Sequence, residues 1–470
     1  MKKLLAIFWI LSLTLQAQIN IKPEIRYQKV EGWGTSLIWW AHMTGQWEDE
    51  AKIDSLVDLL VSPEHLNMNI FRYNIGGGDH PSHYSTPEKP GHMAKGKGIR
   101  AEMEGFLDAE NAAYVWERDA GQRKIMLKIK EKRPDAIFEA FSNSPPYWMT
   151  YSACSAGHFD PSQDNLKPEY YEAFCDYLVE VCLHYKNQYG IEFKTLEPFN
   201  EPQTSYWNYQ GSQEGCHFDI ETQIAIIKIL YPKLKASGLN TVIAASDETS
   251  VSSFNKAMRA YLKAGITDKL GQINVHTYKV NDSERLQAKR LSDQIGVDFW
   301  QSESGPQGIK GKNFLNNLGL AQRLIDDMKI MQTQAWLDWQ YMEEHNNTWC
   351  LIRGDFEQEH FQVIKNFYVR QQFTKFIKPN YTIIEADDEN TLAAISPNKE
   401  EIVIVSLNLS NEVESLSYKL PKAYHKAQSY RTTESENGLP TQDFKLKKGK
   451  LSYQLLPHSI QTFVLKQAPE

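Results

Sequence analysis

Short apolar segments recur between residues 30 and 375, and each ends in polar residues or glycine before a stretch with helical periodicity. We expect eight of them to be strands: Val30–Ser36, Met68–Ile75, Ala136–Asn143, Phe193–Asn200, Thr241–Asp247, Gln272–Tyr278, Val297–Glu303 and Ala335–Tyr341. Between them, apolar residues three and four positions apart predict amphipathic helices, most clearly at Glu48–Leu60, Pro168–Tyr189, Ile220–Lys235 and Phe314–Met331. Strands that alternate with helices indicate a parallel sheet, and eight repeats close a (β/α)8 TIM barrel. An open doubly wound sheet is the alternative, although no glycine fingerprint for a nucleotide follows the first strand.

The pattern changes after Phe376, where short alternating segments separated by turn residues predict an appended β-sandwich. These segments are Tyr381–Ile384, Thr391–Ile395, Glu401–Leu407, Ser415–Leu420, Ala427–Thr432, Leu451–Leu455 and Ser459–Val464. The stretch Ile19–Tyr27 is too short to fold alone and is expected to add a strand to that sandwich. The expected organisation is therefore a signal peptide at 1–17, a joining strand at 18–29, a barrel at 30–375 and a β-sandwich at 376–470. No low-complexity linker separates the last two, so we expect them to pack rigidly together.

The N-terminus has the layout of a secretory signal peptide. Met1-Lys2-Lys3 precedes an apolar run from Leu4 to Leu15, and Gln16-Ala17-Gln18 follows it. The run is too short to span a bilayer, and no cysteine lies at the expected cleavage site to carry a lipid. We therefore expect an exported protein, periplasmic or extracellular, without a membrane anchor.

Charge and composition narrow the classes of function. The formal charge of −8 and the pI near 6.0 disfavour nucleic acid and anionic membranes as partners. Aromatic residues make up 12% of the chain, which suits a cleft that stacks on sugar rings but equally suits a large core.

The five cysteines are odd in number and lack the paired spacing of a zinc site, so neither a metal ion nor another cofactor is expected. Cys175 and Cys182 lie seven positions apart in an expected helix and are predicted to share one buried face. Cys154 and Cys216 both follow strands and could form a disulfide in an oxidising compartment, and their pairing stays open.

The residues that close the expected strands carry the candidate chemistry, because active sites in (β/α)8 barrels form at the carboxyl ends of the strands. These residues are mostly carboxylates, amides and aromatic rings, which suit a neutral polyhydroxylated substrate. The clearest are two glutamates. Pro202 holds Glu201 at the tip of the fourth strand, and Glu303 closes the seventh before Gly305 and Pro306.

Retaining hydrolysis of a glycosidic bond needs two carboxyl groups about 5 Å apart, one to protonate the leaving oxygen and one to attack the anomeric carbon. We expect Glu201 and Glu303 to meet across the barrel mouth in these roles. Arg72 on the second strand would keep the pKa of the nucleophile low, or would serve as a structural ion-pair donor. Asp247 and Glu248 are rival carboxylates that we expect to act structurally.

Tryptophans follow the first, third and fourth expected strands and are placed to line a cleft. Trp39 and Trp40 are adjacent, so in an extended segment they point to opposite sides and only one of them need be buried. Trp148 and Trp207 follow later strands and are expected to line the same cleft. Core packing is the alternative for each of these side chains.

Several segments resemble motifs of glycoside hydrolase family 30. They are Glu31-Gly32-Trp33-Gly34, Phe71-Arg72-Tyr73-Asn74-Ile75-Gly76-Gly77, Phe141-Ser142-Asn143-Ser144-Pro145-Pro146, Pro198-Phe199-Asn200-Glu201-Pro202 and Ser302-Glu303-Ser304. The resemblance extends over essentially the whole chain after the signal peptide and implies a (β/α)8 barrel joined to a β-sandwich. It also implies that Glu201 is the acid/base, Glu303 the nucleophile and Asn200 the partner of the sugar 2-hydroxyl.

Within that family, three segments are most similar to endo-β-1,6-galactanases: Trp39-Trp40-Ala41, Ser142-Asn143-Ser144-Pro145-Pro146-Tyr147-Trp148-Met149 and Gln213-Glu214-Gly215-Cys216-His217-Phe218. This similarity implies internal cutting of β-1,6-linked galactan, such as the side chains of arabinogalactan. The expected substrate-binding residues are Asn200, Arg72, Trp40, Asn143, Trp207, His276, Tyr278 and Trp339. The alternatives are the β-1,6-glucanase, glucosylceramidase-like and xylanase activities of the same family. A catalytically silent carbohydrate-binding protein is the alternative from another class, which the presence of both glutamates disfavours.

Overall fold

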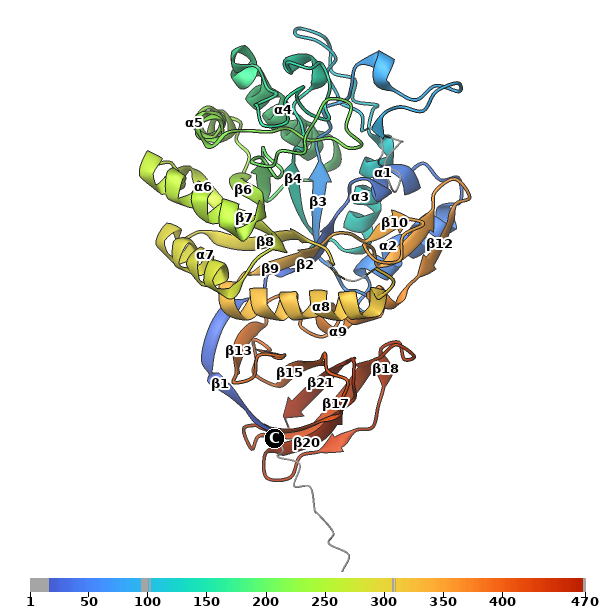
Figure 1. Ribbon diagram of the computed structural model, residues 1–470, viewed down its shortest axis with the longest axis vertical. Coiled ribbons are helices and arrows are strands. Elements are labelled where there is room, and N and C mark those ends of the chain that lie inside the picture. The colour runs from blue at the N-terminus through green and yellow to red at the C-terminus, as the bar shows by residue number, and fades with distance from the viewer. Residues whose placement is uncertain (1–16, 94–99, 101–102, 307, 309, 468–470) are drawn as a thin grey trace, which may run out of the picture.

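The computed structural model describes residues 17–93, 100, 103–306, 308 and 310–467. The predicted signal peptide lies outside these residues except for Ala17. The described chain forms a barrel of parallel strands wrapped by helices, with a strand-rich domain packed against one side (Figure 1). No helix in the described ranges is long and apolar enough to cross a membrane.

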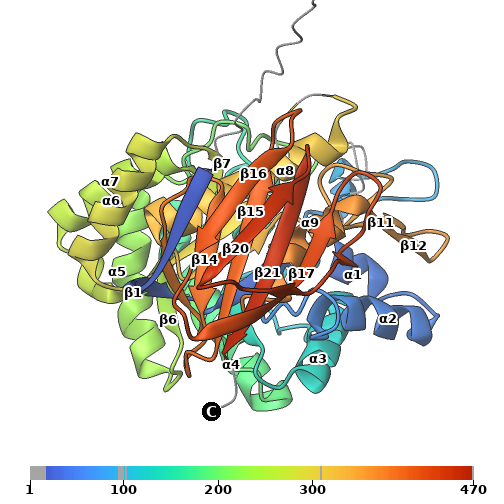
Figure 2. The same cartoon turned by 90° about the horizontal axis from the view of Figure 1, so that it is seen from below.

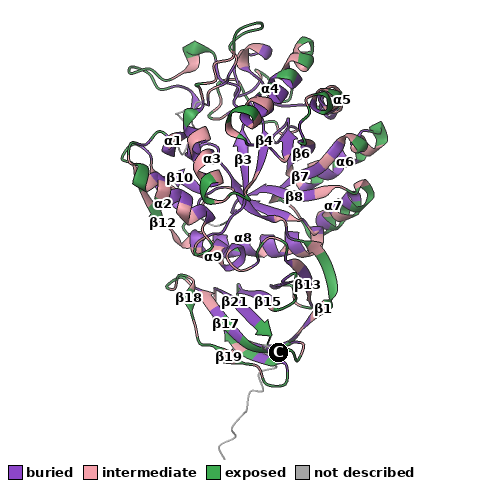
Figure 3. Cartoon of the chain, turned by 180° about the vertical axis from the view of Figure 1, so that it is seen from behind, coloured by how far each residue is buried: buried purple, intermediate pink, exposed green. Residues whose placement is uncertain are grey.

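Eight parallel strands close the barrel in sequence order, which confirms the predicted (β/α)8 fold. They are β2 (Gly32–Ser36), β3 (Ile70–Asn74), β4 (Ile137–Phe141), β5 (Thr195–Glu197), β6 (Val242–Ser250), β7 (Leu270–Lys279), β8 (Asp298–Ser304) and β9 (Ala335–Asp338). The last strand pairs with the first in parallel, from Gly32↔Ala335 to Thr35↔Asp338. Most residues of these strands are buried, because side chains fill the barrel interior and helices cover its outside (Figure 3).

Helices surround the barrel. They are α1 (Trp40–Thr44), α2 (Glu50–Val61), α3 (Ala120–Lys132), α4 (Tyr171–Tyr189), α5 (Ile220–Ala236), α6 (Val251–Ala264), α7 (Asp282–Ile295), α8 (Asn313–Asp326) and α9 (Lys365–Thr374). Single turns of other types are η1 (Pro81–His83), η3 (Tyr147–Met149), η4 (Pro168–Tyr170), η5 (Thr267–Lys269) and the π-helical η6 (Asp327–Met331). Helix α4 shows why the periodicity was readable: the predicted stripe of Phe174, Leu178, Val181 and Tyr185 is buried, and Gly190 ends the helix with a φ of 61°.

Two strand boundaries differ from the prediction near the candidate site. The fourth barrel strand, expected over Phe193–Asn200, is only three residues long. Pro198 follows it and has no N–H group with which to continue the ladder. Glu201 therefore lies in the loop beyond the strand, with a φ of 48°. The fifth strand is longer than expected, since β6 continues beyond Asp247 with register shifts in its pairing to β7.

The strand-rich domain combines the C-terminal strands with the N-terminal one. Its strands are β1 (Ala17–Lys29), β13 (Thr382–Ala386), β14 (Thr391–Ile395), β15 (Glu401–Asn408), β16 (Glu414–Lys419), β17 (Tyr424–Thr432), β18 (Leu439–Pro440), β19 (Phe444–Lys445), β20 (Lys450–Leu455) and β21 (Ser459–Gln467). Strand β1 connects two parts of the sheet, because residues 17–20 pair in parallel with β16 and residues 21–29 pair antiparallel with β13 (Figure 2). Tyr418 of β16 packs on Phe463 of β21 with ring centroids 5.5 Å apart, so the two parts face each other across a core.

Contacts around α9 fasten this domain to the barrel. Gln372 of α9 donates from Nε2 to Thr432 Oγ1 at 2.9 Å and accepts on Oε1 from Thr462 Oγ1 at 2.6 Å. From the barrel side, Trp33 Nε1 donates to the carbonyl of Ile377 at 2.6 Å. Helices α8 and α9 lie between the barrel strands and the strand-rich domain in Figure 1. These buried contacts agree with the rigid packing expected from the absence of a linker, while the domain boundaries in the sequence stay a prediction.

A small sheet follows the last barrel strand and was not predicted. It consists of β10 (Met342–Glu344), β11 (Ile352–Asp355) and β12 (His360–Val363).

The cysteines also correct one option left open by the sequence. Cys154 and Cys216 are free and buried, so they form no disulfide, and Cys154 faces Asp79 instead. Cys175 and Cys182 are buried on α4 as predicted.

Candidate active site

A cavity of about 520 Å³ opens at the carboxyl ends of the barrel strands. Every strand contributes to its lining, either from its last residues or from the loop that follows it. Seven of the predicted site residues line it: Asn143, Asn200, Glu201, Trp207, Tyr278, Glu303 and Trp339. The other three, Arg72, Trp40 and His276, do not. The barrel therefore brings residues from distant parts of the sequence together in one place.

Glu201 and Glu303 approach each other closely in this cavity. One carboxylate oxygen of each and a ring nitrogen of His276 all lie within 4.8 Å of one another. The backbone N–H of Glu201 donates to the carbonyl of Asp247 at 2.9 Å, which fixes the loop after β5, and Glu303 is held within β8. This separation fits the roughly 5 Å of retaining glycosidases and is too short for the roughly 6.5–9.5 Å of inverting ones.

His276 on β7 joins the two carboxylates. Its Nδ1 lies 3.0 Å from Glu201 Oε1 and 3.5 Å from Glu303 Oε1, while its Nε2 lies 3.1 Å from Asp247 Oδ1. Burial alone would lower the pKa of His276, but the surrounding carboxylates of Glu303, Asp247 and Glu201 raise that pKa to about 10. The ring is therefore an imidazolium at neutral pH. It is completely buried, so it orients the carboxylates and does not reach into the cavity.

Arg72 on β3 supplies a second fixed positive charge. Its guanidinium is completely buried and pairs with Glu139 at 2.8 Å, with Glu303 at 3.4 Å and with Asp247. The planar group also lies over the ring of Phe141, 4.1 Å from its centroid. Both expectations for Arg72 are thus met in part, since it is a structural ion-pair donor and also contacts the predicted nucleophile. Because it does not line the cavity, its position does not support the predicted direct contact with substrate.

The buried surroundings also change the protonation of Glu303. Burial raises the pKa of Glu303 to about 7, and the charge of Glu201 adds to that rise, whereas His276 and Arg72 oppose it. Arg72 lowers the pKa of Glu303, as expected from the sequence, but burial raises that pKa by more. Tyr278 donates from its hydroxyl to Glu303 Oε1 at 2.8 Å and so stabilises the ionised form.

The rival carboxylates lie outside the cavity and serve the framework. Burial opposes ionisation of Asp247, but Arg72 and His276 hold the pKa of Asp247 below its usual range. Ser302 donates to its Oδ1 at 2.5 Å. Burial raises the pKa of Glu248 to about 7, and Gln203 donates to Glu248 at 2.6 Å from Nε2.

The tryptophans divide between wall and core. Trp39 lines the cavity, whereas Trp40 is buried against Tyr341, with its Nε1 donating to the carbonyl of Ser36 at 2.9 Å. We expected that only one of this adjacent pair need be buried, but both are, because the segment turns into a helix instead of staying extended. Trp40 does not line the cavity, so its position does not support the predicted contact with substrate. The reason is that Trp40 begins helix α1, whose inward face packs on the barrel. Trp148 also lies off the cavity.

Some lining residues were missed from the sequence. Trp349 packs on Tyr278 with ring centroids 6.0 Å apart, and it lies in the loop between β10 and β11 of the small sheet that was not predicted. The guanidinium of Arg100 lies 4.6 Å from the ring centroid of Trp39 and 5.6 Å from that of Trp339. Neither residue closes a strand, so the strand-end signal could not find them. The aromatic excess of the chain was the one signal that pointed toward Trp349.

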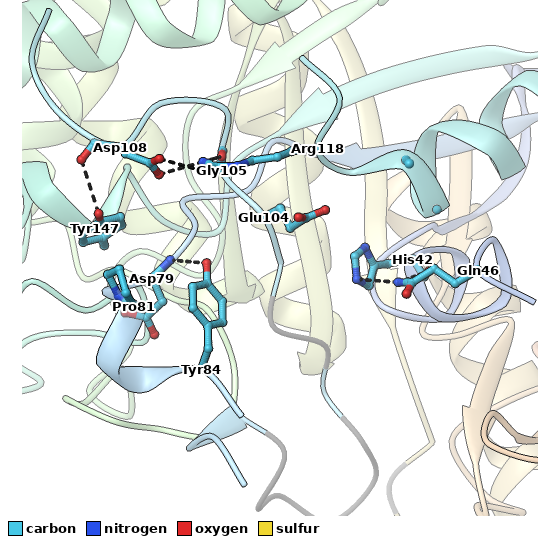
Figure 4. A pocket seen from close by; sticks show the side chains of 12 residues that line it. His42, Gln46, Asp79, Pro81, Tyr84, Glu104, Gly105, Asp108, Arg118 and Tyr147 are labelled. Carbon is cyan, nitrogen blue, oxygen red and sulfur yellow. Dashed lines mark hydrogen bonds and ion pairs between the residues drawn. The ribbon is translucent and has the colours of Figure 1, made fainter. Parts of the chain in front are cut away.

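The structure also contains a second cavity and several groups of side chains that could bind a metal ion. A larger cavity of about 660 Å³ includes His42, Asp79, Glu104 and Tyr147 in its lining but neither Glu201 nor Glu303 (Figure 4). Among the described residues, four groups bring ligand-type atoms within 4.8 Å of one another, and they are Asp79/His83/His92/Cys154, Asp164/His217/Asp219, Glu201/His276/Glu303 and Glu344/His345/Asp355. In the third group Arg72 and His276 already balance the carboxylates, so its charge does not call for a metal ion.

Comparison with known proteins places the chain in a group of glycan hydrolases. It matches O-Glycosyl hydrolase family 30 over residues 16–261. It is 30% identical over 474 residues to an endo-beta-1,6-galactanase of Hypocrea rufa, an alignment that covers 95% of this chain and 94% of that protein. An exo-beta-1,6-galactobiohydrolase of Bifidobacterium longum subsp. longum is 26% identical over 420 residues, which cover 70% of this chain and 27% of that longer protein.

Solved structures share the same architecture. A conserved exported protein from Bacteroides fragilis superposes with a TM-score of 0.81 at 19% identity, covering 95% of this chain and 100% of that one. The catalytic domain of a GH30 xylanase C from Talaromyces cellulolyticus gives a TM-score of 0.73 at 19% identity, covering 96% and 100% of the two chains. At these identities the likeness shows the fold alone.

Proposed function

The chain belongs to glycoside hydrolase family 30, and from this we propose that it is a retaining endo-glycosidase that cuts β-1,6-linked galactan. The observation that carries the catalytic part of the proposal is the close pair of Glu201 and Glu303 in a cavity at the barrel mouth. Two carboxyl groups at this spacing leave no room for a water molecule between an inverting base and the sugar. The reaction is therefore a double displacement.

In the first step Glu303 attacks the anomeric carbon while Glu201 gives its proton to the departing glycosidic oxygen. The hydroxyl of Tyr278 and the charges of His276 and Arg72 stabilise the attacking anion. Once Glu303 is esterified, Glu201 acts as the base and accepts a proton from the water that releases the sugar.

The amide of Asn200 is positioned to bind the sugar next to the cleaved bond. Asn200 lines the cavity, and its buried Oδ1 accepts no hydrogen bond from the residues that the structure describes. A buried acceptor of this kind costs free energy unless a ligand supplies a donor, and a sugar 2-hydroxyl can do so. Asn143, Trp207, Tyr278 and Trp339 are the other proposed contacts, because all of them line the cavity.

Internal cutting is supported by aromatic rings that extend beyond the two glutamates. Tyr206 lines the cavity and is 49% exposed. Phe159 is 63% exposed and packs on Tyr209 with ring centroids 4.8 Å apart, next to the cavity-lining Asn208. Exposed rings at or beside the cavity can stack on sugars of a long chain, and the axial 4-hydroxyl of galactose leaves one sugar face apolar enough to suit them. The Hypocrea rufa relative, named an endo-beta-1,6-galactanase, supports the same choice.

A second candidate is release of galactobiose from chain ends, which the name of the Bifidobacterium relative favours. Digestion of debranched arabinogalactan, β-1,6-glucan and xylan by the purified protein separates the possibilities, with the Glu303→Ala variant as the control for contaminating activity. We expect early digests of the galactan to contain galactose oligomers of several lengths. Galactobiose alone would favour the second candidate, and activity on β-1,6-glucan or xylan without activity on galactan would reject the substrate while leaving the glutamates in place. Binding of galactan without any hydrolysis would indicate a silent carbohydrate-binding protein.

We also propose that the protein is exported, on the strength of the N-terminal signal-like sequence. Fractionation of cells expressing the full chain, with N-terminal sequencing of the recovered protein, tests this. Recovery from the periplasm or medium with an N-terminus near residue 18 is expected, whereas an intact N-terminus in the cytoplasm would reject it.

A further inference from the structure

Four side chains of metal-binding type meet beside the candidate active site. They are Asp79, His83, His92 and Cys154, and one ligand atom from each lies within 4.8 Å of the others. Asp79, His92 and Cys154 are buried, and His83 is half-buried. The first three residues in sequence belong to the loop after β3 and the fourth to the loop after β4. Two imidazoles, one thiolate and one carboxylate form a donor set typical of tetrahedral zinc.

The spacing of these atoms is close to that of a tetrahedral site. With metal–ligand bonds of about 2.0 Å to nitrogen or oxygen and about 2.3 Å to sulfur, neighbouring ligands stand about 3.3 Å apart, or about 3.5 Å when one is sulfur. Cys154 Sγ lies 3.8 Å from both His92 Nε2 and Asp79 Oδ2. Asp79 lies 2.9 Å from His83 Nδ1 and 2.6 Å from His92 Nε2, as direct hydrogen bonds do. An ion between them would replace these two hydrogen bonds and lengthen the contacts by about half an ångström.

The outward nitrogens of both histidines are occupied, which leaves the other nitrogens directed at the cluster. His92 Nδ1 contacts the carbonyl oxygen of Gly211. That oxygen can only accept, so Nδ1 carries the proton and Nε2 faces Asp79 and Cys154. His83 Nε2 lies 3.4 Å from the hydroxyl of Tyr209. Metal-bound histidines make this kind of outer hydrogen bond, because it fixes the tautomer and the orientation of the ring.

The contact between His92 Nε2 and the Asp79 carboxylate needs a positive charge between them, supplied either by a proton or by a metal ion. We propose that these four residues bind one zinc ion. The thiolate and the carboxylate carry two negative charges, so a divalent ion leaves the buried site neutral. The cysteine spacing in the sequence gave no hint of this site, because Asp79 and Cys154 are 75 positions apart and come from different loops.

Such an ion would brace one wall of the candidate active site. It would tie the loop after β3 to the loop after β4, and through Gly211 and Tyr209 to the loop after β5. Gly211 itself lines the cavity with the two glutamates, and Asp79 lines the neighbouring cavity drawn in Figure 4. The proposal goes beyond the glycosidase reaction and does not depend on which glycan is cut.

The test is the metal content of the purified protein after dialysis against zinc and then against metal-free buffer, measured by plasma mass spectrometry. We expect one zinc per chain. Cys154→Ser and His83→Gln should each weaken zinc binding by at least about tenfold, because even outer-sphere changes cost that much. Cys216→Ser removes another buried thiol, outside the cluster, and should retain the zinc. His83 is half-buried, so His83→Gln tests the site even if Cys154→Ser fails to fold.

Cobalt substitution provides a readout specific to the thiolate. Cobalt-loaded wild-type protein should show the charge-transfer absorption of a cobalt–sulfur bond, which Cys154→Ser loses and Cys216→Ser keeps. Zinc should also raise the melting temperature of the wild type more than that of His83→Gln, since it binds the folded state. Absence of zinc from the dialysed wild type, or equal zinc in the wild type and His83→Gln, would overturn the proposal.

Discussion

The cluster around Glu201 and Glu303 and the cluster around Asp79 differ in the source of their positive charge. Around Glu201 and Glu303 it is built into the protein, as the guanidinium of Arg72 and the imidazolium of His276. Around Asp79 the facing groups are two histidines and a thiol, which we propose share an added ion. A pair of carboxylates that must exchange protons during a reaction needs fixed counter-charges. A cluster that only holds loops together can depend on a bound ion.

The largest expected effect comes from removing the proposed nucleophile of the first cluster. Glu303→Ala should lower the rate of galactan hydrolysis by several powers of ten, because the proposed covalent intermediate forms on this carboxylate. Melting curves should show that the variant folds. Glu221→Ala, an exposed carboxylate on α5, is the control and should keep the wild-type rate. More than about a tenth of the wild-type rate in Glu303→Ala would reject the assignment.

Glu201→Ala distinguishes the acid from the nucleophile. Hydrolysis of the polysaccharide should be severely slowed, because the departing sugar oxygen needs a proton. An aryl galactoside with an acidic phenol as leaving group should be affected much less in its first step. The comparison of the two substrates under identical conditions is the measurement. Equal losses on both would show that Glu201 does something other than protonate the leaving group.

Arg72→Met tests how much the buried guanidinium stabilises the carboxylates around it. It leaves Glu139, Asp247 and Glu303 without their shared cation, so we expect the free energy of unfolding to fall by about 3–5 kcal/mol. Denaturation in urea measures this, with Arg290→Met on the exposed side of α7 as the matched control. A loss below about 1 kcal/mol, as expected for a surface pair, would mean that the buried network contributes little.

The smallest expected effect concerns pH. Burial raises the pKa of Glu303 to about 7, so kcat/KM should fall as the pH drops through about 7 and the nucleophile takes up a proton. Tyr278→Phe removes a hydrogen bond to the anion. It should therefore move this acid limb to higher pH and lower the rate at neutral pH about tenfold. A limb near the ordinary pKa of glutamate, unmoved in Tyr278→Phe, would contradict this account of the site.

The fold was readable from the sequence because its signals are local. Alternating apolar segments and helices predicted all eight barrel strands in order, although the fourth, expected to run to Asn200, ends before Pro198. The meeting of Glu201 and Glu303 followed from the barrel alone, since carboxyl ends of parallel strands share one rim. What failed depended on the direction of single side chains. Trp40 turned into the core because it begins a helix, which a pair of adjacent tryptophans does not reveal.

Contacts between residues far apart in the sequence were the other feature that the sequence did not predict. The sequence left open a disulfide between Cys154 and Cys216, but both cysteines are free and Cys154 lies next to Asp79 and His92. Asp79 and His92 belong to a loop without a strand pattern, so the sequence did not indicate that they approach Cys154. The net shift in the pKa of Glu303 also could not be predicted from the sequence. It depends on how deeply Glu303 is buried, which only the folded barrel determines. Arg100 and Trp349 reach the cavity from segments between recognisable elements, so their contribution depends on how those segments fold.

The central claim is that Glu303 forms a covalent bond to the sugar, and trapping that bond tests it most directly. An activated 2-deoxy-2-fluoro-β-galactoside should label the wild-type protein, because the fluorine slows release of the intermediate more than its formation. Peptide mass spectrometry of the labelled protein should then find the sugar on Glu303, with no label on Glu303→Ala. A label on any other residue, or turnover without a trapped sugar and with inversion at the anomeric carbon, would contradict the account.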